Sequence, residues 1–308
     1  EDALRNSIEI IEKWHLGAEG RVRIALAPPY IFGRHTWTRY THKYEPEHVP
    51  VMKEKALEFR ELADKYNVQI HSHIFGDTID WAVENIGRET VDKVLGPDVV
   101  IAHGNGLKQS EVEVIATNKA SVASAPSTGE NLWYDYAPLV ELIEAGANCT
   151  ITTDGSAPRF SFDLFKDISR AMWHQWIRHE TQAVLPGGKA LRMVTIDAAK
   201  ALQVDHETGS LEAGKKADII LVDLDKPHLT PTTYVPHQLC FYVNGHDVDT
   251  TIIDGRIVME NTQVLSVNAQ EVMELARVEA QKAIDLIDLD EFRPSDKVFW
   301  HGSRYEEV

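Results

Sequence analysis

Three short apolar stretches decide the fold of this chain: VQIHSH at residues 68–73, VVIAHG at 99–104 and CTITTDG at 149–155. Each is rich in Val, Ile and Thr and has the length of one buried strand, whereas the segments between them carry helical periodicity. This alternation predicts parallel strands joined by helices. Because such strands present their carboxyl ends at one edge, the polar residues that close the three stretches are expected to meet at a common mouth.

The same alternation extends outward to five strand-and-helix units. Strands are predicted at 21–28, 68–73, 98–103, 120–125 and 148–153, with helices at 48–66, 78–86, 109–117, 136–145 and 162–178. A closed barrel of eight units needs about 250 residues, and this region of about 200 residues accounts for five of them. The fold class is therefore predicted to be α/β, with part of a barrel.

After a helix at 190–201 the pattern changes to short alternating runs with glycine turns, which predict a small antiparallel sheet. A further helix is expected from Ala269 to about Ile287. We divide the chain accordingly into 1–203, 204–265 and 266–308. The predicted antiparallel strands lie within GSLEAGKKADIILVDLD (209–225), CFYVNG (240–245), DTTIIDG (249–255) and RIVMEN (256–261).

Composition narrows the choice of partners. The 308 residues are 43% hydrophobic and carry a formal net charge of −17, which disfavours nucleic acid and anionic membrane surfaces. Two cysteines are too few for a disulfide framework, and no apolar run reaches the roughly 20 residues of a membrane span. We expect a cytoplasmic protein with a small-molecule substrate, and leave open whether it is a homo-oligomer.

His73, His103 and Asp154 are the candidate metal ligands, because imidazole and carboxylate groups at strand ends suit a divalent ion. Each also has a plainer explanation. The histidines could be satisfied polar residues, and Asp154-Gly155 could be an ordinary turn. His71 faces the same side as His73, since strand side chains alternate, and it is a candidate substrate contact.

The loop at 29–47 is dense in aromatic and cationic residues and follows the first predicted strand. Arg34 and Trp37 within it are candidates for lining a substrate pocket, with the arginine available to bind an anionic group. Plain packing explains the aromatic residues about as well.

These residues, together with TGSLEAGKKADIILVD (208–223) and DTTIIDGRIV (249–258), resemble the amidohydrolase superfamily, in particular its branch of triazine hydrolases and cytosine or adenosylhomocysteine deaminases. The resemblance covers nearly the whole chain. It implies a distorted (β/α)8 TIM-type barrel, of which strands four to eight are present, with the C-terminal part of a small β-sandwich at 204–265. It also implies that the first strand, with its His-x-His pair, lies upstream of Glu1.

By this resemblance His73 is the strand-five metal ligand, and His103 polarises the substrate or binds a second metal. Asp154 ligates the metal and accepts a proton from the attacking water. The implied metal is zinc, with iron and manganese as alternatives. No lysine is visible on the strand at 21–28 to bridge two metals, so one ion is the simpler expectation.

Two departures from the family pattern bear on the reaction. Gly76 stands where the deaminases carry a glutamate, with Asp77 as its neighbour, and Ser124 stands near the usual strand-seven histidine. We take Asp77 and Ser124 as candidate substrate contacts. These departures favour hydrolysis of an amide, cyclic amide or amidine of a small molecule by metal-activated water, at a carbon–nitrogen bond other than a peptide bond. The alternatives are deamination of a purine, pterin or pyrimidine, and a non-catalytic binding module.

Overall fold

The computed structural model describes residues 2–33, 48–132, 135–155 and 161–286. Within these ranges four strands form one sheet, in the order β1-β2-β3-β4, and each pairs in parallel with its neighbour. The strand predictions at these four places are confirmed. The strands are β1 (Ile70–Ile74), β2 (Val99–His103), β3 (Ser121–Ser124) and β4 (Asn148–Ile151).

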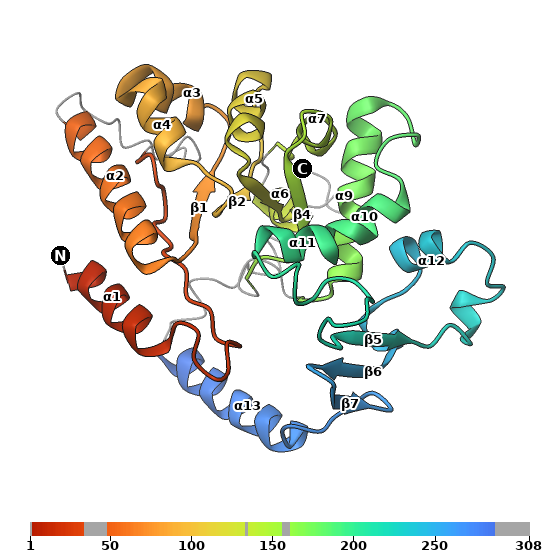
Figure 1. Ribbon diagram of the computed structural model, residues 1–308. Coiled ribbons are helices and arrows are strands. Elements are labelled where there is room, and N and C mark those ends of the chain that lie inside the picture. The colour runs from red at the N-terminus through yellow and green to blue at the C-terminus, as the bar shows by residue number, and fades with distance from the viewer. Residues whose placement is uncertain (1, 34–47, 133–134, 156–160, 287–308) are drawn as a thin grey trace, which may run out of the picture.

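Helices surround this sheet on its outer side, as an arc that follows the order of the strands (Figure 1). The connection between β1 and β2 is longer than predicted, since the helix continues through a π-helical turn at Val83–Gly87. The predicted helix at 136–145 is shorter, because Pro138 precedes its start. The helices are α2 (Val49–Tyr66), α3 (Thr78–Ala82), α4 (Arg88–Val94), α5 (Gln109–Asn118), α6 (Pro126–Leu132), α7 (Leu139–Glu144) and α9 (Leu164–His179).

The core lies on both faces of the parallel sheet. Val99, Val100 and Ile101 are buried in succession along β2, which is the burial expected of a strand covered on two sides. Ile70 on β1 and Cys149 on β4 are fully buried in the same cluster. Helix packing and parallel pairing therefore depend on the same apolar side chains.

The segment predicted as a strand at 21–28 pairs only briefly with β1. Leu26 forms a parallel bridge to Ile70, and its carbonyl accepts the His71 amide at 2.8 Å. Pro28 and Pro29 follow, and neither has an N–H to continue the ladder. This segment therefore lies at the edge of the sheet as extended chain.

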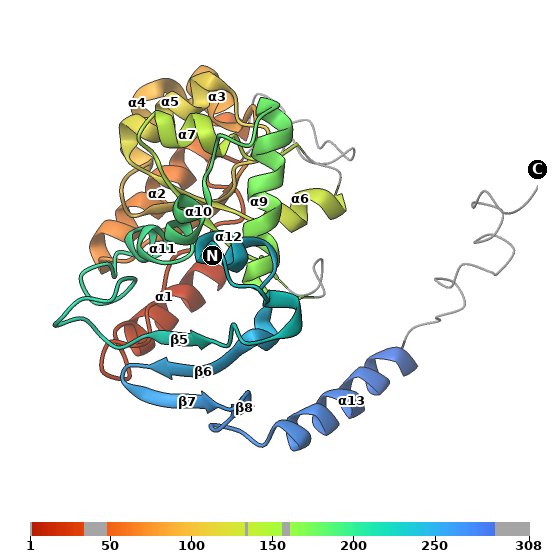
Figure 2. The same ribbon diagram turned by 90° about the vertical axis from the view of Figure 1, so that its right-hand side faces the viewer.

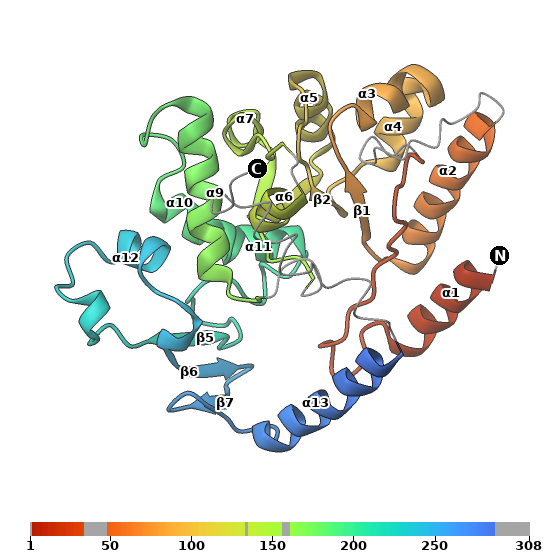
Figure 3. The same ribbon diagram turned by 180° about the vertical axis from the view of Figure 1, so that it is seen from behind.

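The second sheet is antiparallel, in the order β5-β6-β7-β8. It lies apart from the parallel sheet, on the far side of the helix at Ile196–Ala201 (α11) (Figures 1 and 3). Asp254 and Gly255 both have positive φ and form the tight turn predicted between β6 and β7. The strands are β5 (Ile219–Val222), β6 (Val248–Ile253), β7 (Arg256–Glu260) and β8 (Gln263–Val264).

The prediction of a strand at CFYVNG (240–245) is wrong. Helix α12 (Val235–Phe241) covers the first two residues, with Pro236 in its first turn, where a missing N–H costs nothing. Cys240 is buried against Gly187, and the apolar run serves helix packing. A short apolar run does not distinguish a buried strand from a helix by periodicity alone.

The remaining helices flank this arrangement: α1 (Asp2–Trp14), α10 (Gly187–Met193), α11 (Ile196–Ala201) and α13 (Ala269–Asp285). The helix predicted at 190–201 is thus interrupted, near Val194 and Thr195. Helix α13 buries none of its residues and extends away from the rest of the chain (Figure 2). In the described part of the chain, no helix is both long enough and apolar enough to span a bilayer.

Glu111 ties together the connections that follow β1 and β2. Its fully buried carboxylate accepts the backbone N–H groups of Asp77 at 3.0 Å and Ile79 at 2.8 Å, at the start of α3. It also accepts the N–H of Lys108 at 3.0 Å, at the start of α5. One side chain therefore satisfies the orphan donors of two helix ends and fixes two loops at the carboxyl edge of the sheet.

Replacing Glu111 by Ala should lower the free energy of unfolding by about 3 kcal/mol, because several buried N–H groups lose their acceptor. Urea unfolding measures this change. Glu113→Ala is the matched control, since Glu113 is exposed on the same helix, and it should cost under about 0.5 kcal/mol. Equal effects of the two variants would show that Glu111 does not anchor these loops.

Candidate functional site

Three of the predicted residues come together at the carboxyl ends of β1, β2 and β4. The imidazole rings of His73 and His103 are stacked, with centroids 5.1 Å apart and planes 15° from parallel. His103 Nε2 lies 3.9 Å from Asp154 Oδ2. The site thus gathers two imidazoles and one carboxylate from three different strands, as the parallel topology requires.

The hydrogen bond of His73 determines which of its nitrogens is available. Nδ1 lies 3.0 Å from the carbonyl oxygen of Pro29, which can only accept, so Nδ1 carries the proton. Nε2 is left with a lone pair. A backbone carbonyl that holds one nitrogen in this way is the usual support of a metal-binding histidine.

His103 is more deeply placed, with 7% of its surface exposed and the ring of Phe75 stacked on it at 5.3 Å. Burial lowers the pKa of His103 to about 4, with the neighbouring His73 adding to this effect and Asp154 opposing it. Its Nδ1 is buried and has no hydrogen-bond partner among the described residues. His103 is therefore neutral near pH 7 and can bind a metal or donate one hydrogen bond.

The Asp154 carboxylate is held by two donors. Gly155 N–H donates to Oδ1 at 2.6 Å, and the Thr128 hydroxyl donates to Oδ2 at 2.8 Å. About a third of the side chain, 31%, remains exposed to solvent. The carboxylate therefore keeps lone pairs for a cation or a proton while its orientation is fixed.

Backbone conformation marks the same positions. His103 and Asp154 have φ angles of 73° and 63°, and Asp77 in the loop after β1 has a φ of 70°. Residues other than glycine seldom adopt this left-handed region, although in this structure it also occurs at turns away from the site, such as those at Asn67 and Asp254. At each of these three residues the backbone turns sharply away from the strand that precedes it.

The donors fit a divalent ion in kind, but they do not form a closed site. Among the residues with described positions, no group of three His, Cys, Asp or Glu side chains could hold a metal ion. The assignment of His73, His103 and Asp154 as ligands therefore stays a prediction.

A close contact between two loops explains why residue 76, in the loop after β1, is a glycine. A Cβ on Gly76 would lie 2.0 Å from the carbonyl oxygen of Gly106, and Gly76 N–H donates to Asn105 at 2.8 Å. No larger residue fits this close contact between two backbones. The adjacent Asp77 forms an ion pair with Lys108, and no contact of its side chain with the site histidines occurs in the described ranges.

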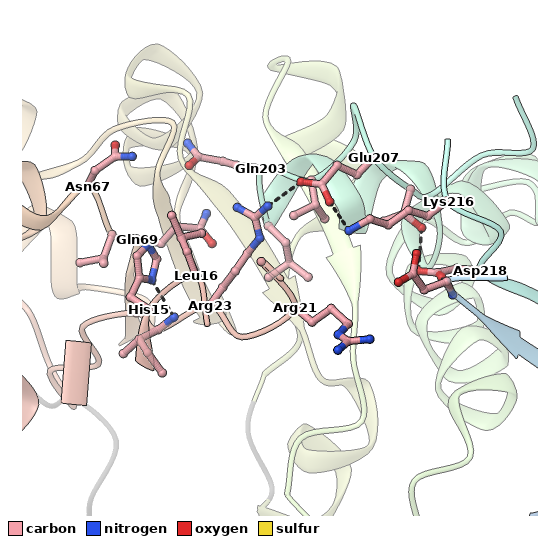
Figure 4. A pocket seen from close by; sticks show the side chains of 18 of the residues that line it. His15, Leu16, Arg21, Arg23, Asn67, Gln69, Gln203, Glu207, Lys216 and Asp218 are labelled. Atoms are coloured by element: carbon pink, nitrogen blue, oxygen red, sulfur yellow. Dashed lines mark hydrogen bonds and ion pairs between the residues drawn. The ribbon is translucent and has the colours of Figure 1, made fainter. Parts of the chain in front are cut away.

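The other predicted residues lie in different places. Ser124 is buried at the end of β3, next to the mouth, and Arg34 and Trp37 lie outside the described residues. His71 instead lines a cavity of about 700 Å³ at the amino end of β1. Glu207 lies in that cavity between Arg23 and Lys216, and pairs with both (Figure 4).

Sequence reasoning missed Thr128, whose hydroxyl contacts Asp154. Thr128 lies in a helix that follows β3, two residues after Pro126, and no periodicity marks it. The only feature of the sequence that pointed to Thr128 was its place in the connection after β3, at the carboxyl edge of the parallel sheet.

Comparison with known proteins adds relatives of similar sequence. The chain is 31% identical over 287 residues to 5′-deoxyadenosine deaminase of Methanosarcina acetivorans, and 33% identical over 286 residues to that of Methanothermobacter thermautotrophicus. It is 30% identical over 280 residues to 5-methylthioadenosine/S-adenosylhomocysteine deaminase of Thermoanaerobacter pseudethanolicus. These matches cover 88% to 91% of this chain and 61% to 62% of the relatives, so the chain spans under two thirds of their length.

Solved structures share the fold. A zinc-bound adenosine deaminase from Xanthomonas campestris superposes with a TM-score of 0.77 at 21% identity, covering 92% of this chain and 62% of that one. Atrazine chlorohydrolase TrzN from Arthrobacter aurescens, complexed with zinc, gives 0.74 at 20% identity, with 89% and 59% covered. These neighbours indicate a TIM-barrel-like α/β fold. The family model described as "Amidohydrolase family" matches residues 3–258, and the chain belongs to that family.

Proposed function

We propose that this protein acts as a hydrolytic deaminase of a purine nucleoside, with a 5′-substituted adenosine such as 5′-deoxyadenosine as its substrate. The observation that carries the proposal is similarity to such deaminases over about nine tenths of the chain, 91% for the Methanosarcina relative. Both expected enzyme reactions hydrolyse a carbon–nitrogen bond. The relatives favour deamination, the alternative in our sequence analysis, over cleavage of an amide.

The site residues support this chemistry through a metal ion, which we propose to be zinc. His73 would bind it through Nε2, since Nδ1 is hydrogen-bonded to the carbonyl of Pro29. Asp154 and His103 would be the other ligands from the described residues. When bound, zinc lowers the pKa of its water towards about 7 and supplies a hydroxide nucleophile.

Asp154 is the proposed proton carrier. In the reaction water adds to C6 of the adenine ring, the bond from C6 to the amino nitrogen breaks, and ammonia leaves. Asp154 takes the proton of the attacking water and later delivers it to the leaving nitrogen. Its Oδ2 lies 3.9 Å from His103 Nε2, which supports a role for this carboxylate beside the imidazole proposed to face the developing charge.

His103 supports the same step as a neutral group. Since burial lowers its pKa to about 4, the imidazole is uncharged near pH 7. A neutral imidazole can bind the metal through a lone pair or donate one hydrogen bond to the oxygen that gains negative charge. Both roles require the ring to stay fixed, and its stacking on the rings of His73 and Phe75 supports this.

The second proton of the attacking water ends on the purine ring nitrogen, and Asp77 is the candidate to carry it there. No side chain fits at Gly76, so Asp77 is the first residue of this loop that could reach the substrate. In the structure its carboxylate pairs with Lys108, and that ion pair has to open for this role. Ser124, at the end of β3, would line the substrate pocket.

Metal content tests the site directly. Purified protein should contain about one zinc ion per chain, and His73→Ala and Asp154→Ala should each lose it, because each removes a ligand. Plasma mass spectrometry measures the metal, and an ammonia assay with 5′-deoxyadenosine measures turnover. His206→Ala is the control, since the His206 side chain is 67% exposed and pairs with Glu207, which lines the cavity at the amino end of β1. Folded parent protein without metal or ammonia release would contradict the proposal.

The pH dependence of stability tests the state of His103. Its folded pKa of about 4 lies below the usual 6.5, so the unfolded chain binds a proton that the folded chain does not. The free energy of unfolding should therefore fall as the pH drops from about 7 to about 4.5, and His103→Gln should reduce that fall by about 2 kcal/mol. Urea unfolding at both pH values measures it, with His206→Gln as control. An unchanged fall in His103→Gln would show that His103 titrates normally.

A further inference from the structure

Thr128 contacts the candidate site from a helix that the proposed reaction does not otherwise use. It lies in α6, is 4% exposed, and donates its hydroxyl to Asp154 Oδ2 at 2.8 Å. That oxygen is the one that faces His103 Nε2. The Thr128 hydroxyl therefore acts on the carboxylate oxygen closest to the other site residues.

Asp154 depends on such a contact for its orientation. Its backbone φ of 63° turns the chain away from β4, and it lies two residues beyond Thr152, whose N–H still donates to the carbonyl of Ser124 at 2.8 Å. The Gly155 N–H holds Oδ1, and Thr128 holds Oδ2. With only one of these donors the carboxylate could rotate, because a single hydrogen bond does not fix the plane of the group.

The position of Thr128 is itself fixed from the other side. The preceding residue, Ser127, donates its backbone N–H at 3.1 Å and its hydroxyl to Asp167, which is 3% exposed on α9. Helix α6 lies beside α9 (Figure 2), and Thr128 N–H bonds to Ala125 at 3.0 Å. The hydroxyl is thus carried by a buried, anchored turn and is not a freely rotating surface group.

We infer that Thr128 is a positioning residue, which holds Asp154 with Oδ2 towards His103 so that the carboxylate can bind the metal and accept the proton of the attacking water. This inference rests on the proposed function. The hydroxyl supplies one hydrogen to Oδ2 and leaves the remaining lone pairs of the carboxylate free. Groups that orient a metal ligand in this way typically contribute 10- to 100-fold to metal affinity or activity.

The decisive variants are Thr128→Val, which removes the hydroxyl and keeps the shape, and Thr128→Ser, which keeps the hydroxyl. Thr128→Val should weaken zinc binding and lower kcat by about tenfold each, with KM for 5′-deoxyadenosine changed by under about twofold. Thr128→Ser should stay within about threefold of the parent protein in all three. Chelator competition measures zinc affinity, and the ammonia assay measures kcat and KM.

Thr90→Val is the matched control, because Thr90 is 6% exposed on α4, away from the three site residues. It should leave zinc affinity, kcat and KM at the parent values. If Thr128→Val matched Thr90→Val in zinc affinity and kcat, or if Thr128→Ser were as impaired as Thr128→Val, the inference would be overturned.

A double-mutant cycle separates this inference from the proposed function. Thr128→Val, Asp154→Ala and the double variant are compared by urea unfolding, which needs neither metal nor substrate. The folding equilibrium constants should show a coupling of about fivefold between the two sites. A coupling near one overturns the positioning role. A clear coupling in a parent protein that binds no zinc and releases no ammonia supports the Thr128 contact and refutes the deaminase proposal alone.

Discussion

Parallel pairing of β1, β2, β3 and β4 is the constraint on which the rest of the structure depends. Each strand must return to the amino edge through a helix before the next one starts, so all four carboxyl ends lie at one edge. His73, His103 and Asp154 are separated by up to 81 residues in the sequence, yet this topology brings His103 into contact with His73 and within 3.9 Å of Asp154. The order of the strands is therefore what brings the proposed metal ligands to one edge.

The convergence of the loops has a structural cost, which buried polar contacts offset. His103, Asp154 and Asp77 all adopt positive φ, and each left-handed residue costs on the order of 1 to 3 kcal/mol. Glu111 restrains the loop of Asp77, and Thr128 restrains Asp154. Both supporting residues come from the first turns of helices at this edge, where free N–H groups and short polar side chains are available.

The sequence predicted the parts of the fold that depend on periodicity. The four parallel strands, and helices α2, α5 and α9, lie where alternating apolar runs placed them, and the histidines were found because they close such runs. It failed at CFYVNG, where an apolar run forms a helix, and at Pro28, which stops the edge segment from joining the ladder. Thr128 and Glu111 could not be identified, because their roles depend on contacts across 26 and 34 residues.

The contact between Gly76 and Gly106 explains why the choice between deamination and amide cleavage could not be settled from single residues. Position 76 lacks the glutamate that the resemblance leads one to expect, and the structure shows that the two loops approach too closely for any side chain there. The loss of that carboxylate is therefore coupled to how the β1 and β2 connections pack. Because Asp77 is the next residue, the same close approach that removes one acid holds another at the mouth, paired with Lys108.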